Sequence, residues 1–526
     1  MSCTCVRQTD LPATTQLAAD VLYQPDRVSR FYRHPLPGLA SFQAAAGEIR
    51  FSDSRRAALI SALRVCNPES PALARMARPG TLAVVAGQQV GLFGGPAYTV
   101  YKALHAAKLA RWLTANGIPA VPVFWLATED HDFAEVDHVW AFDAGHRPSK
   151  VETRRGASAG AQPAGQVALP SPPLSDLRDA MAGLPFLDEA AGLAEESYRP
   201  GATMGEAFGV WLRRTLKEFD ILQVDPMLPQ FRELAAPAIR TALEAAPELS
   251  ARVLERGREL VAAGYHAQVH VDEHTSFVFL LENGKRLALR RHGDDYLLSG
   301  RRIGSRELMD KAASLSPNAL LRPVVQESML PAAAYIGGSA EIAYLAQSQV
   351  LYAALLGRMP VAVPRAGFTI VDERSRKRMD RYGLSLVDFF HGEEALRARI
   401  SAKLVPPALV GAMRETAASV DSAVARLRDE MAGFDATLAQ AVDRSARKIR
   451  YQIEKIGRKA GREALARDAR AARAAASLSG LIYPERHLQE RLYSILPFLA
   501  SHGLGLIARI FEEIQLDSPD HRVLAA

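Results

Sequence analysis

Residues 82–138 read LAVVAGQQVGLFGGPAYTVYKALHAAKLARWLTANGIPAVPVFWLATEDHDFAEVDH. The apolar run Leu82–Ala86 indicates a buried strand, and a glycine-rich turn follows it. The periodic segment Ala97–Leu113 indicates a helix, which the Asn-Gly pair at 116–117 ends. The apolar run Ala120–Leu126 then indicates a second buried strand. A strand, a turn, a helix and another strand form the crossover unit of a parallel α/β sheet.

Polar residues follow the second strand directly. The five residues from Thr128 to Asp132 read TEDHD and come after the apolar Phe124-Trp125-Leu126. Ligands of open α/β sheets bind outside the carboxyl ends of the strands, where this cluster and the glycine turn both belong. Burying carboxylates beside a histidine costs free energy unless they are paired, so the cluster predicts a functional site.

The cluster predicts catalytic residues. We expect His131 to act as a general base or to bind substrate or nucleotide, with Asp130 or Asp132 orienting it. Two alternatives remain at this point. The three side chains could bind a metal ion, or one of the two aspartates could simply cap a helix.

A second glycine turn resembles the first. Ala334–Ser339 reads AYIGGS and precedes a helix pattern over Ala340–Leu356; strand-like runs at Leu320–Gln326 and Met359–Pro364 lie on either side. Glycines before a helix let the backbone approach an anion, although neither turn is a Walker loop or a GxGxxG motif. Tyr344 is a further candidate for a pocket wall. The predicted substrate- or nucleotide-binding residues are Gly87, Gln88, Gln89, Gly91, Gly94, Gly95, Tyr98, Lys102, Glu129, Arg322, Gln326, Tyr335, Gly337, Gly338, Ser339 and Glu341.

Composition limits the class of protein. The chain has 526 residues, a net charge of +6 and three cysteines, and we find no apolar run of the roughly 18 residues that a membrane span needs. We therefore expect two or three lobes, a cytoplasmic location and no membrane contact. Cys3 and Cys5 lack the second ligand pair of a metal site, so no metal is expected. The basic segment Arg444–Arg473 indicates a solvated helical face or, alternatively, an anion or nucleotide contact; nucleic acid is not an expected partner.

The remaining patterns divide the chain into a core with two insertions. A helix over Gly205–Phe219 and a strand at Ile221–Val224 continue the core, and residues 268–291 alternate around an Asn-Gly turn, which predicts a hairpin. The expected segments are a mostly helical lead-in (1–80), the first part of the core (81–140), an insertion (141–204), the core continuation (205–262), a second insertion with the hairpin (263–318), the second part of the core (319–390) and a coiled coil with a helical tail (391–526).

A heptad seam runs through the last segment. Apolar residues recur every four and three positions from Met413 to Leu438, slip near Val442 and resume from Ala446 to Ala460. The pattern predicts one long helix, a turn near 477–484 and a helical tail over Leu488–Ile514. Such a helix must pack on a partner chain or on the returning tail, so we expect a homodimer through the coiled coil.

Several segments together resemble the BshC family, the cysteine-adding enzymes of bacillithiol biosynthesis. They are GQQVGLFGGPAYTVYKA, VPVFWLATEDHDFAEVDH, SPNALLRPVVQESMLPAAAYIGGSAEIAYLAQ, YQIEKI and LQERLYSILPFLA, and they extend from about residue 80 to the C-terminus. The resemblance implies an α/β fold: a Rossmann-like core similar to class I nucleotidyltransferases, two connecting insertions and a C-terminal α-helical coiled coil that supports dimerisation.

The resemblance also implies an activity, the joining of L-cysteine to the amine of glucosaminyl-malate to form bacillithiol. Such an amide bond needs an activated carboxyl group, and ATP with Mg²⁺ would fit this core. The two glycine turns would then hold phosphates, His131 would stabilise a phosphate or take a proton, and Arg322 would hold the malate carboxylates. The chain departs from ATP-using class I synthetases because it lacks the HIGH and KMSKS motifs, and Arg374–Lys377 is a poor substitute.

A different class of function remains as the alternative. The chain would then be a non-catalytic dimeric coiled-coil scaffold, or a protein that binds a ligand or nucleic acid through its Rossmann-like core. The polar cluster and the paired glycine turns would have no task in such a scaffold, which favours the ligase.

Overall fold

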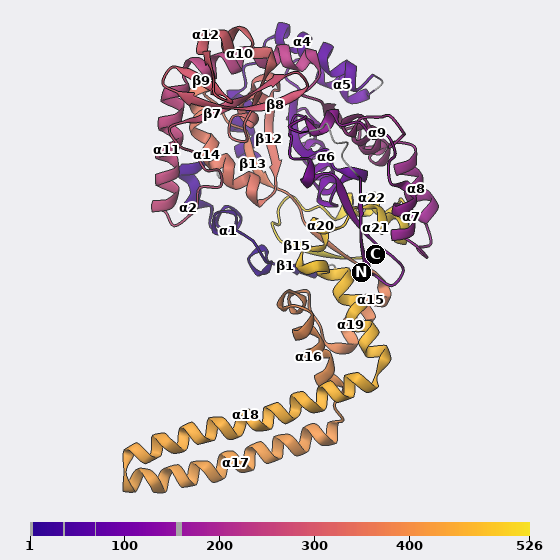
Figure 1. The fold of residues 1–526 in the computed structure, drawn as a ribbon, viewed down its shortest axis with the longest axis vertical. Coiled ribbons are helices and arrows are strands. Elements are labelled where there is room, and N and C mark those ends of the chain that lie inside the picture. Colours follow the sequence, from indigo (N-terminus) through magenta and orange to yellow (C-terminus); the bar gives the residue numbers. More distant parts are fainter. Residues whose placement is uncertain (1–3, 35–36, 69, 154–159) are drawn as a thin grey trace.

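The computed structural model describes residues 4–34, 37–68, 70–153 and 160–526, and a parallel sheet forms its centre (Figure 1). The five strands lie in the order β13-β12-β2-β3-β6. The chain lays down β2, β3 and β6 in one direction, then crosses back and adds β12 and β13 beside β2. The switch point of this doubly wound sheet therefore lies between β2 and β12. The strands are β2 (Leu82–Gln89), β3 (Ala120–Ala127), β6 (Leu222–Val224), β12 (Ala332–Gly337) and β13 (Val361–Pro364).

Helices cover both faces of the sheet, and alternate strand residues enter two separate cores. Val84 of β2 belongs to the core under α6 (Tyr98–Ala115), whereas its neighbour Val85 belongs to the core under α14 (Ser339–Leu355). Because both faces are buried, the strands read as continuous apolar runs rather than alternating ones. The predicted crossover and its α/β class are confirmed.

The first insertion leaves the core after β3. It contains a two-stranded hairpin and three helices that return to β6. Much of 145–200, expected as long loops or an inserted subdomain, is helical; residues 154–159 lie outside the described part. The elements are β4 (His138–Phe142), β5 (Pro148–Glu152), α7 (Leu174–Ala180), α8 (Leu187–Glu195) and α9 (Met204–Thr215).

The second insertion carries its own sheet. The predicted hairpin is confirmed: β7 (Thr275–Glu282) and β8 (Lys285–His292) pair around Asn283 and Gly284, both with positive φ. The hairpin belongs to an antiparallel sheet in the order β10-β9-β8-β7-β11, which the sequence did not predict. The other elements are α10 (Pro229–Glu244), α11 (Ala246–Ala262), β9 (Asp295–Leu298), β10 (Arg301–Gly304) and β11 (Leu315–Pro317).

The expected strand at Leu320–Gln326 is wrong. This segment enters helix α13 (Arg322–Met329), and the core strand is β12, which includes much of the supposed glycine turn. The Asn318 side chain accepts hydrogen bonds from the backbone N–H groups of Leu320 and Leu321 and so starts the helix, and Pro323 occupies its first turn. A short helix that is buried over most of its length cannot be told from a strand by periodicity.

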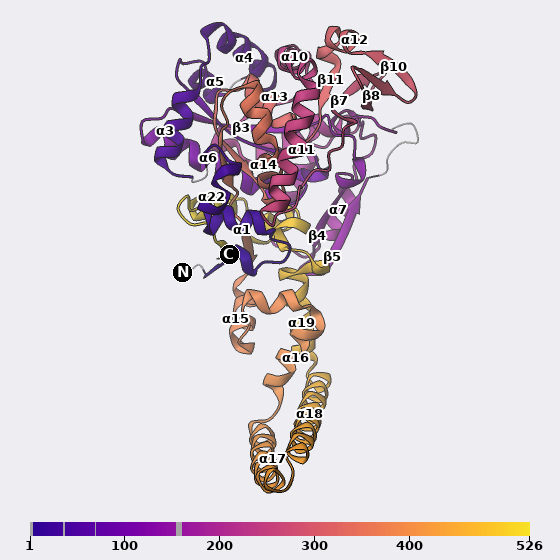
Figure 2. The ribbon, with the colours of Figure 1, turned by 90° about the vertical axis from the view of Figure 1, so that its left-hand side faces the viewer.

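The long helix predicted for the coiled coil is also wrong in one respect, because it folds back on itself. Helices α17 (Pro407–Phe434) and α18 (Ala436–Arg467) form an antiparallel pair that projects from the body of the molecule (Figure 2). The break falls at Asp435, whose carboxylate accepts from the Thr437 N–H. Arg428 and Asp443 form an ion pair across the two helices, as do Arg450 and Asp421. Part of the heptad stripe thus packs within one chain, while Leu427, Phe434, Leu438, Ile449 and Ile456 remain exposed.

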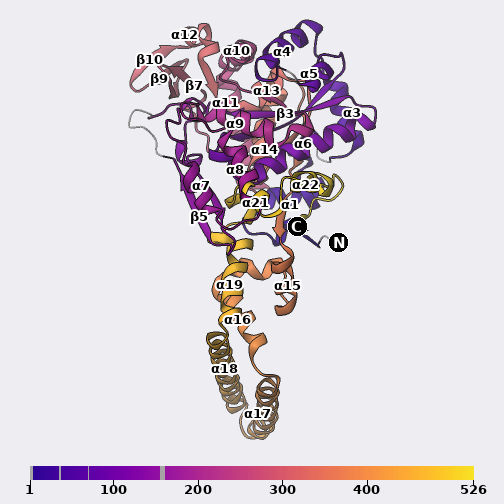
Figure 3. The same cartoon turned by 90° about the vertical axis from the view of Figure 1, so that its right-hand side faces the viewer.

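The two ends of the chain meet in a small sheet that the sequence did not predict. Strand β15 (His521–Ala525) lies between β1 (Thr4–Val6) and β14 (Phe368–Val371), so the termini are neighbours (Figure 3). The tail before it is helical as expected, but in short pieces that pack on the core. These are α19 (Ala469–Ile482), α20 (Gln489–Leu492), α21 (Leu496–His502) and α22 (Leu506–Glu513).

Helices fill most of the described lead-in, as predicted. The longest is α4 (Asp53–Cys66), with α1 (Gln16–Tyr23), α3 (Leu39–Glu48) and α5 (Pro71–Met76) around it. In the described part of the chain no helix combines the length and the apolar composition that crossing a bilayer requires.

Candidate active site

A cavity of about 650 Å³ opens at the carboxyl ends of the central strands. Gly87–Gln89 of β2, Glu129 and Asp130 after β3, and Ser339 at the start of α14 contribute to its walls. Phe279 from the second insertion closes another side. The cavity thus lies at the switch point of the sheet, where ligands of doubly wound folds bind.

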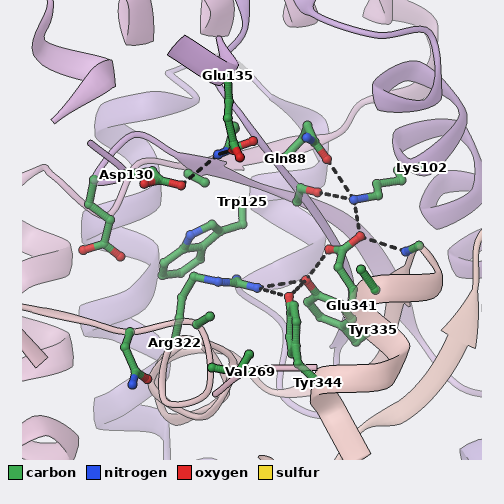
Figure 4. A pocket seen from close by; sticks show the side chains of 18 of the residues that line it. Gln88, Lys102, Trp125, Asp130, Glu135, Val269, Arg322, Tyr335, Glu341 and Tyr344 are labelled. Atoms are coloured by element: carbon green, nitrogen blue, oxygen red, sulfur yellow. Dashed lines mark hydrogen bonds and ion pairs between the residues drawn. The ribbon is translucent and has the colours of Figure 1, made fainter. Parts of the chain in front are cut away.

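A buried ion pair joins the two halves of the core inside this cavity. Lys102 of α6 and Glu341 of α14 are paired, and their side chains are 3% and 18% exposed (Figure 4). Lys102 Nζ also donates to Gly87 O at 3.1 Å and Gln88 Oε1 at 2.9 Å. Burial alone would raise the pKa of Glu341, but Lys102 and the Gly338 N–H hold it below its ordinary value. The pair is therefore ionised.

Arg322 presents a positive charge with no carboxylate in hydrogen-bonding contact among the described residues. Its Nη2 donates to the hydroxyls of Tyr335 at 3.1 Å and Tyr344 at 2.7 Å, and Nη1 donates to Gln326 Oε1 at 3.2 Å (Figure 4). Burial opposes the charge, yet the two tyrosines and Glu341 hold the pKa of Arg322 well above its ordinary value. A guanidinium held by neutral groups remains available to an anionic ligand.

Glu129 is the matching buried anion. Its Oε2 accepts from Arg232 Nη1 at 3.2 Å, while Oε1 has no hydrogen-bond partner among the described residues. The side chain is only 4% exposed and lines the cavity. Arg232 is fixed from behind, because its Nε donates to Ala313 O at 2.9 Å. An unsatisfied buried carboxylate oxygen costs free energy unless a ligand donates to it.

Asp130 extends the acidic wall. It accepts from Gln89 Nε2 at 2.8 Å and from the His131 N–H at 2.7 Å, and the Arg286 guanidinium lies 3.8 Å from its Oδ1. Gln89 Nε2 also donates to Glu135 Oε2 at 2.6 Å. Glu129, Asp130 and Glu135 therefore give the β3 side of the cavity a negative charge, opposite in sign to Arg322.

Two further arginines line the cavity beyond β13. Arg365 donates to Glu490 Oε1 at 2.5 Å and lies 5.0 Å from the centre of the Tyr98 ring. Its charge also affects His105, whose pKa burial lowers to about 4. Exposed Arg491 is the second arginine. Five cationic side chains and four carboxylates thus line the cavity.

Comparison with known proteins identifies the family. The family model "Bacillithiol biosynthesis BshC, N-terminal Rossmann-like domain" matches residues 1–366, and "Bacillithiol biosynthesis BshC, C-terminal coiled-coil domain" matches 368–526. The chain belongs to the BshC family. The family match confirms the predicted resemblance and the predicted Rossmann-like and coiled-coil architecture.

Curated relatives cover the whole length of the chain. A protein of Solibacter usitatus is 66% identical over 100% of both chains, and one of Koribacter versatilis is 36% identical over 99% of both. A third, from Symbiobacterium thermophilum, is 32% identical over 85% of both chains. Each carries the name "Putative cysteine ligase BshC". These names agree with the prediction of a ligase.

Most of the predicted binding residues come together in the BshC-family cavity, and the others do not. Twelve of the predicted site residues line it: Gly87, Gln88, Gln89, Tyr98, Lys102, Glu129, Asp130, Arg322, Tyr335, Gly338, Ser339 and Glu341. The wall does not include Gly91, Gly94, Gly95, His131, Asp132, Gln326 or Gly337. Of these, Gln326 supports Arg322 from outside the cavity.

The glycines at 91–95 serve packing instead of anion binding. A Cβ on Gly94 would overlap the Trp211 ring, and φ of Gly94 is +89°. The Tyr198 hydroxyl accepts from the Gly94 N–H at 3.0 Å and donates to Gly91 O at 2.9 Å. The turn is therefore filled by side chains from the first insertion, which removes the space that a phosphate would need.

His131 lies beside the cavity. Its Nδ1 accepts from Arg286 Nη1 at 3.0 Å, and its ring lies 5.7 Å from that of Phe279. Asp132 is exposed. The described residues include no group of three His, Cys, Asp or Glu side chains that converge as metal ligands, so Asp130, His131 and Asp132 do not form the alternative metal site. Asp130 instead stabilises the turn after β3 by accepting from backbone N–H groups.

The sequence did not predict the residues that reach the cavity wall from segments far from the two glycine turns. Trp125 carried a signal, because it ends the strand before the acidic cluster; its buried indole N–H has no hydrogen-bond partner in the described regions. Arg365 directly follows the predicted strand Met359–Pro364, but nothing in its neighbourhood marks it as a ligand. The missed residues are Trp125, Ala127, Glu135, Val269, Phe279, Arg286, Pro317, Asn318, Ala319, Ala340, Arg365 and Arg491.

Proposed function

We propose that this chain joins L-cysteine to the amine of glucosaminyl-malate and so forms bacillithiol. The names of the relatives support the ligase class, and the charge pattern of the cavity supports the substrates. The observation that carries the proposal is the half-buried Arg322, whose guanidinium is held by tyrosine hydroxyls and has no hydrogen-bonded carboxylate among the described residues.

The malate group fits the cationic corner. A dicarboxylate needs two or more positive or N–H donors, and the Arg322 guanidinium forms charge-assisted hydrogen bonds of the kind that carboxylates accept. The start of α14 adds unpaired backbone N–H groups and the positive end of a helix dipole at Ser339 and Ala340. We assign this corner to the malate carboxylates.

The amino groups fit the acidic corner. Glu129 Oε1 lacks a donor, and Asp130 is near it in sequence on the same wall. An ammonium group of cysteine would satisfy this oxygen. Either carboxylate could equally accept the proton that the glucosamine amine loses as the amide forms. We assign cysteine binding to Glu129 and proton acceptance to Asp130.

ATP with Mg²⁺ is the proposed source of activation. ATP would supply the energy for activating the cysteine carboxyl group. The residues fit a polyanion, because Lys102, Arg365 and Arg491 line one part of the wall. Their role would be to offset negative charge and to orient the phosphates against the carboxyl group. The first glycine turn has no part in this proposal.

A mass-spectrometric assay tests the activity. Purified protein is incubated with glucosaminyl-malate and L-cysteine, with and without ATP and Mg²⁺. Bacillithiol that forms only with ATP would support both the ligase and its activation route, and product without ATP would leave the ligase but overturn ATP as its energy source. No product under either condition, from a protein that binds both substrates in calorimetry, would overturn the proposal.

We also propose that the chain forms a homodimer through the α17–α18 pair. The alternative function, a non-catalytic scaffold, would depend on the same dimer. Five apolar residues of the heptad seam remain exposed on this pair: Leu427, Phe434, Leu438, Ile449 and Ile456 are 39–84% exposed. A second chain would cover them. A scaffold with no reaction would leave the charged cavity without a task, so we favour a dimeric ligase.

A further inference from the structure

The positive charge of this chain is concentrated on one helix. The whole chain has a net charge of +6. Helix α18 holds nine lysines and arginines against three acidic residues, an excess equal to that of the entire chain. The rest of the molecule is therefore neutral overall, and a surplus that looked modest in the sequence becomes a dense local one.

These cations lie on one face of α18. At 100° per residue, seven of them fall within about 60° on either side of Arg444. Arg458 pairs with Glu454, and the other six extend over about 27 Å of the helix. All six are exposed, and none has an ion pair or hydrogen-bond partner within the described regions. We call them the basic stripe: Arg444, Arg447, Lys448, Lys455, Lys459 and Arg462.

The basic stripe points away from the rest of the protein. The opposite side of α18 packs on its neighbours: a Cβ on Gly457 would lie 3.6 Å from Met413 of α17, and one on Gly461 would meet Ser401 of α16 (Glu393–Leu404). Arg450, which lies on that side, pairs with Asp421. The helix pair itself stands clear of the body, so a large partner can reach the basic stripe (Figures 1 and 2).

An aromatic ring lies within the basic stripe. Tyr451 falls between Lys448 and Lys455 on the same face and is 52% exposed. The Arg458 guanidinium lies 5.3 Å from the centre of its ring. Exposed aromatic rings among unpaired cations are the features with which proteins bind single-stranded nucleic acid: cations contact phosphates, and bases stack on the ring.

We propose that the basic stripe binds the phosphate backbone of a folded RNA, with an unpaired base stacked on Tyr451. The six cations of the stripe extend over about 27 Å, an average rise of about 5 Å from one to the next, which is of the same order as the spacing of phosphates along a strand. The exposed ring favours RNA over duplex DNA, because RNA loops present unstacked bases and a duplex does not.

Two other occupants fit this face less well. A membrane surface needs a continuous apolar face, but the exposed large aliphatic residues of α18 among the described residues are only Leu438, Ile449 and Ile456, spread over about 27 Å of the helix. A second copy of the chain would use the exposed Ile449 and Ile456, which lie about 120–140° around the helix from Arg444. Dimerisation and RNA binding therefore use different faces.

Fluorescence anisotropy with the full chain and a labelled stem-loop RNA tests the proposal. We expect binding that weakens steeply with salt, with a slope of log K against log salt of about −4 for six phosphate contacts. The variant Arg444→Gln/Lys448→Gln/Lys455→Gln/Lys459→Gln should reduce that slope by about 3 and the affinity at least 100-fold. Tyr451→Ala should reduce affinity about 10-fold for RNA with an open loop and leave the salt slope unchanged.

A matched variant removes the same charge elsewhere. Arg258→Gln/Lys311→Gln/Lys377→Gln/Arg397→Gln alters exposed cations that each have an ion pair outside the helix pair, and we expect it to bind RNA as the parent does. An equal loss of RNA affinity in both variants would show that only net charge matters and would overturn the proposal. Absence of RNA binding at 50 mM salt would also overturn it, and so would an equal affinity for duplex DNA. Light scattering measures the oligomeric state of each variant, which we expect to equal that of the parent.

Discussion

Lys102 and Glu341 form an ion pair across the switch point of the sheet. Lys102 follows β2 on α6, and Glu341 follows β12 on α14, so the pair connects the two halves of the doubly wound core at the site itself. Glu341 also accepts from the Tyr335 hydroxyl at 2.9 Å and the Gly338 N–H at 2.8 Å. The ion pair thus fixes the start of α14 and one of the two phenols that hold Arg322.

Removing one partner of this pair should destabilise the protein. We expect Lys102→Met to lower the free energy of unfolding by about 3–5 kcal/mol, because it leaves a carboxylate buried without its cation. Lys102→Met/Glu341→Gln should recover much of that loss. The matched control is Lys108→Met, which breaks an exposed pair with Glu512 and should cost less than about 1 kcal/mol. Urea unfolding measures all three; additive losses in the double variant would contradict the buried ion pair.

Arg322 should determine the affinity for the malate end of the substrate. Arg322→Lys keeps the charge but loses the planar fork, so we expect kcat/KM to fall about 100-fold, or about 3 kcal/mol. The loss should appear in the KM for glucosaminyl-malate and not in that for cysteine. Arg256→Lys, at a buried arginine outside the cavity, is the control. An unchanged KM for glucosaminyl-malate would refute the assignment.

Asp130 and His131 should differ in their effect on ligation. Asp130 lines the cavity, whereas His131 lies beside it and accepts from Arg286. We expect Asp130→Asn to lower kcat at least 100-fold, because the amide cannot accept the proton. His131→Asn should cost about 10-fold or less, since its amide can still accept from Arg286. A larger loss at His131 than at Asp130 would restore the histidine as the base.

The core could be predicted from the sequence because local patterns determine it. The apolar runs of β2 and β3, the Asn-Gly end of α6 and the acidic cluster after β3 are close in sequence, and the rules for strand ends then locate a site. The heptad seam of α17 and α18 was also visible. Its folding back was not, since a single aspartate cap at Asp435 decides it.

The remainder depended on contacts between distant segments. Phe279 and Arg286 reach the cavity from the second insertion, and Arg491 comes from the tail, so no local spacing connects them with β2. Strand β15, the middle strand of the small terminal sheet, is too short to show a period. The turn at Gly94 resembled an anion site in the sequence. Its positive φ and the nearby Trp211 ring require a glycine there, and the sequence alone cannot distinguish that requirement from the close approach of a phosphate.

Charge on the exposed apolar side of α18 should separate the dimer. Ile449 and Ile456 are 41% and 59% exposed and lie one heptad apart, about 120–140° around the helix from Arg444. Ile449→Asp/Ile456→Asp should give a monomer in light scattering, with helix content unchanged by circular dichroism. Leu504→Asp, an equally exposed apolar residue on the body, is the control. A dimer that survives the double change would locate the contact elsewhere.

Glu327 should make stability fall as the pH rises. Burial raises the pKa of Glu327 to about 8, although Arg358, 3.8 Å away, opposes the shift. Between its ordinary value of 4.5 and about 8, the folded state keeps a proton that the unfolded state has released. The stabilising contribution of the protonated carboxyl to the free energy of unfolding is therefore complete below pH 4.5. It decreases by about 1.4 kcal/mol per pH unit between pH 4.5 and about 8.

Glu327→Gln cannot ionise, so its Tm should exceed that of the parent at pH 9 and fall less between pH 6 and 9. Exposed Glu307→Gln should leave the pH dependence of the Tm as it is in the parent. Parallel Tm curves for the parent and Glu327→Gln would show that Glu327 is ionised in the folded protein throughout.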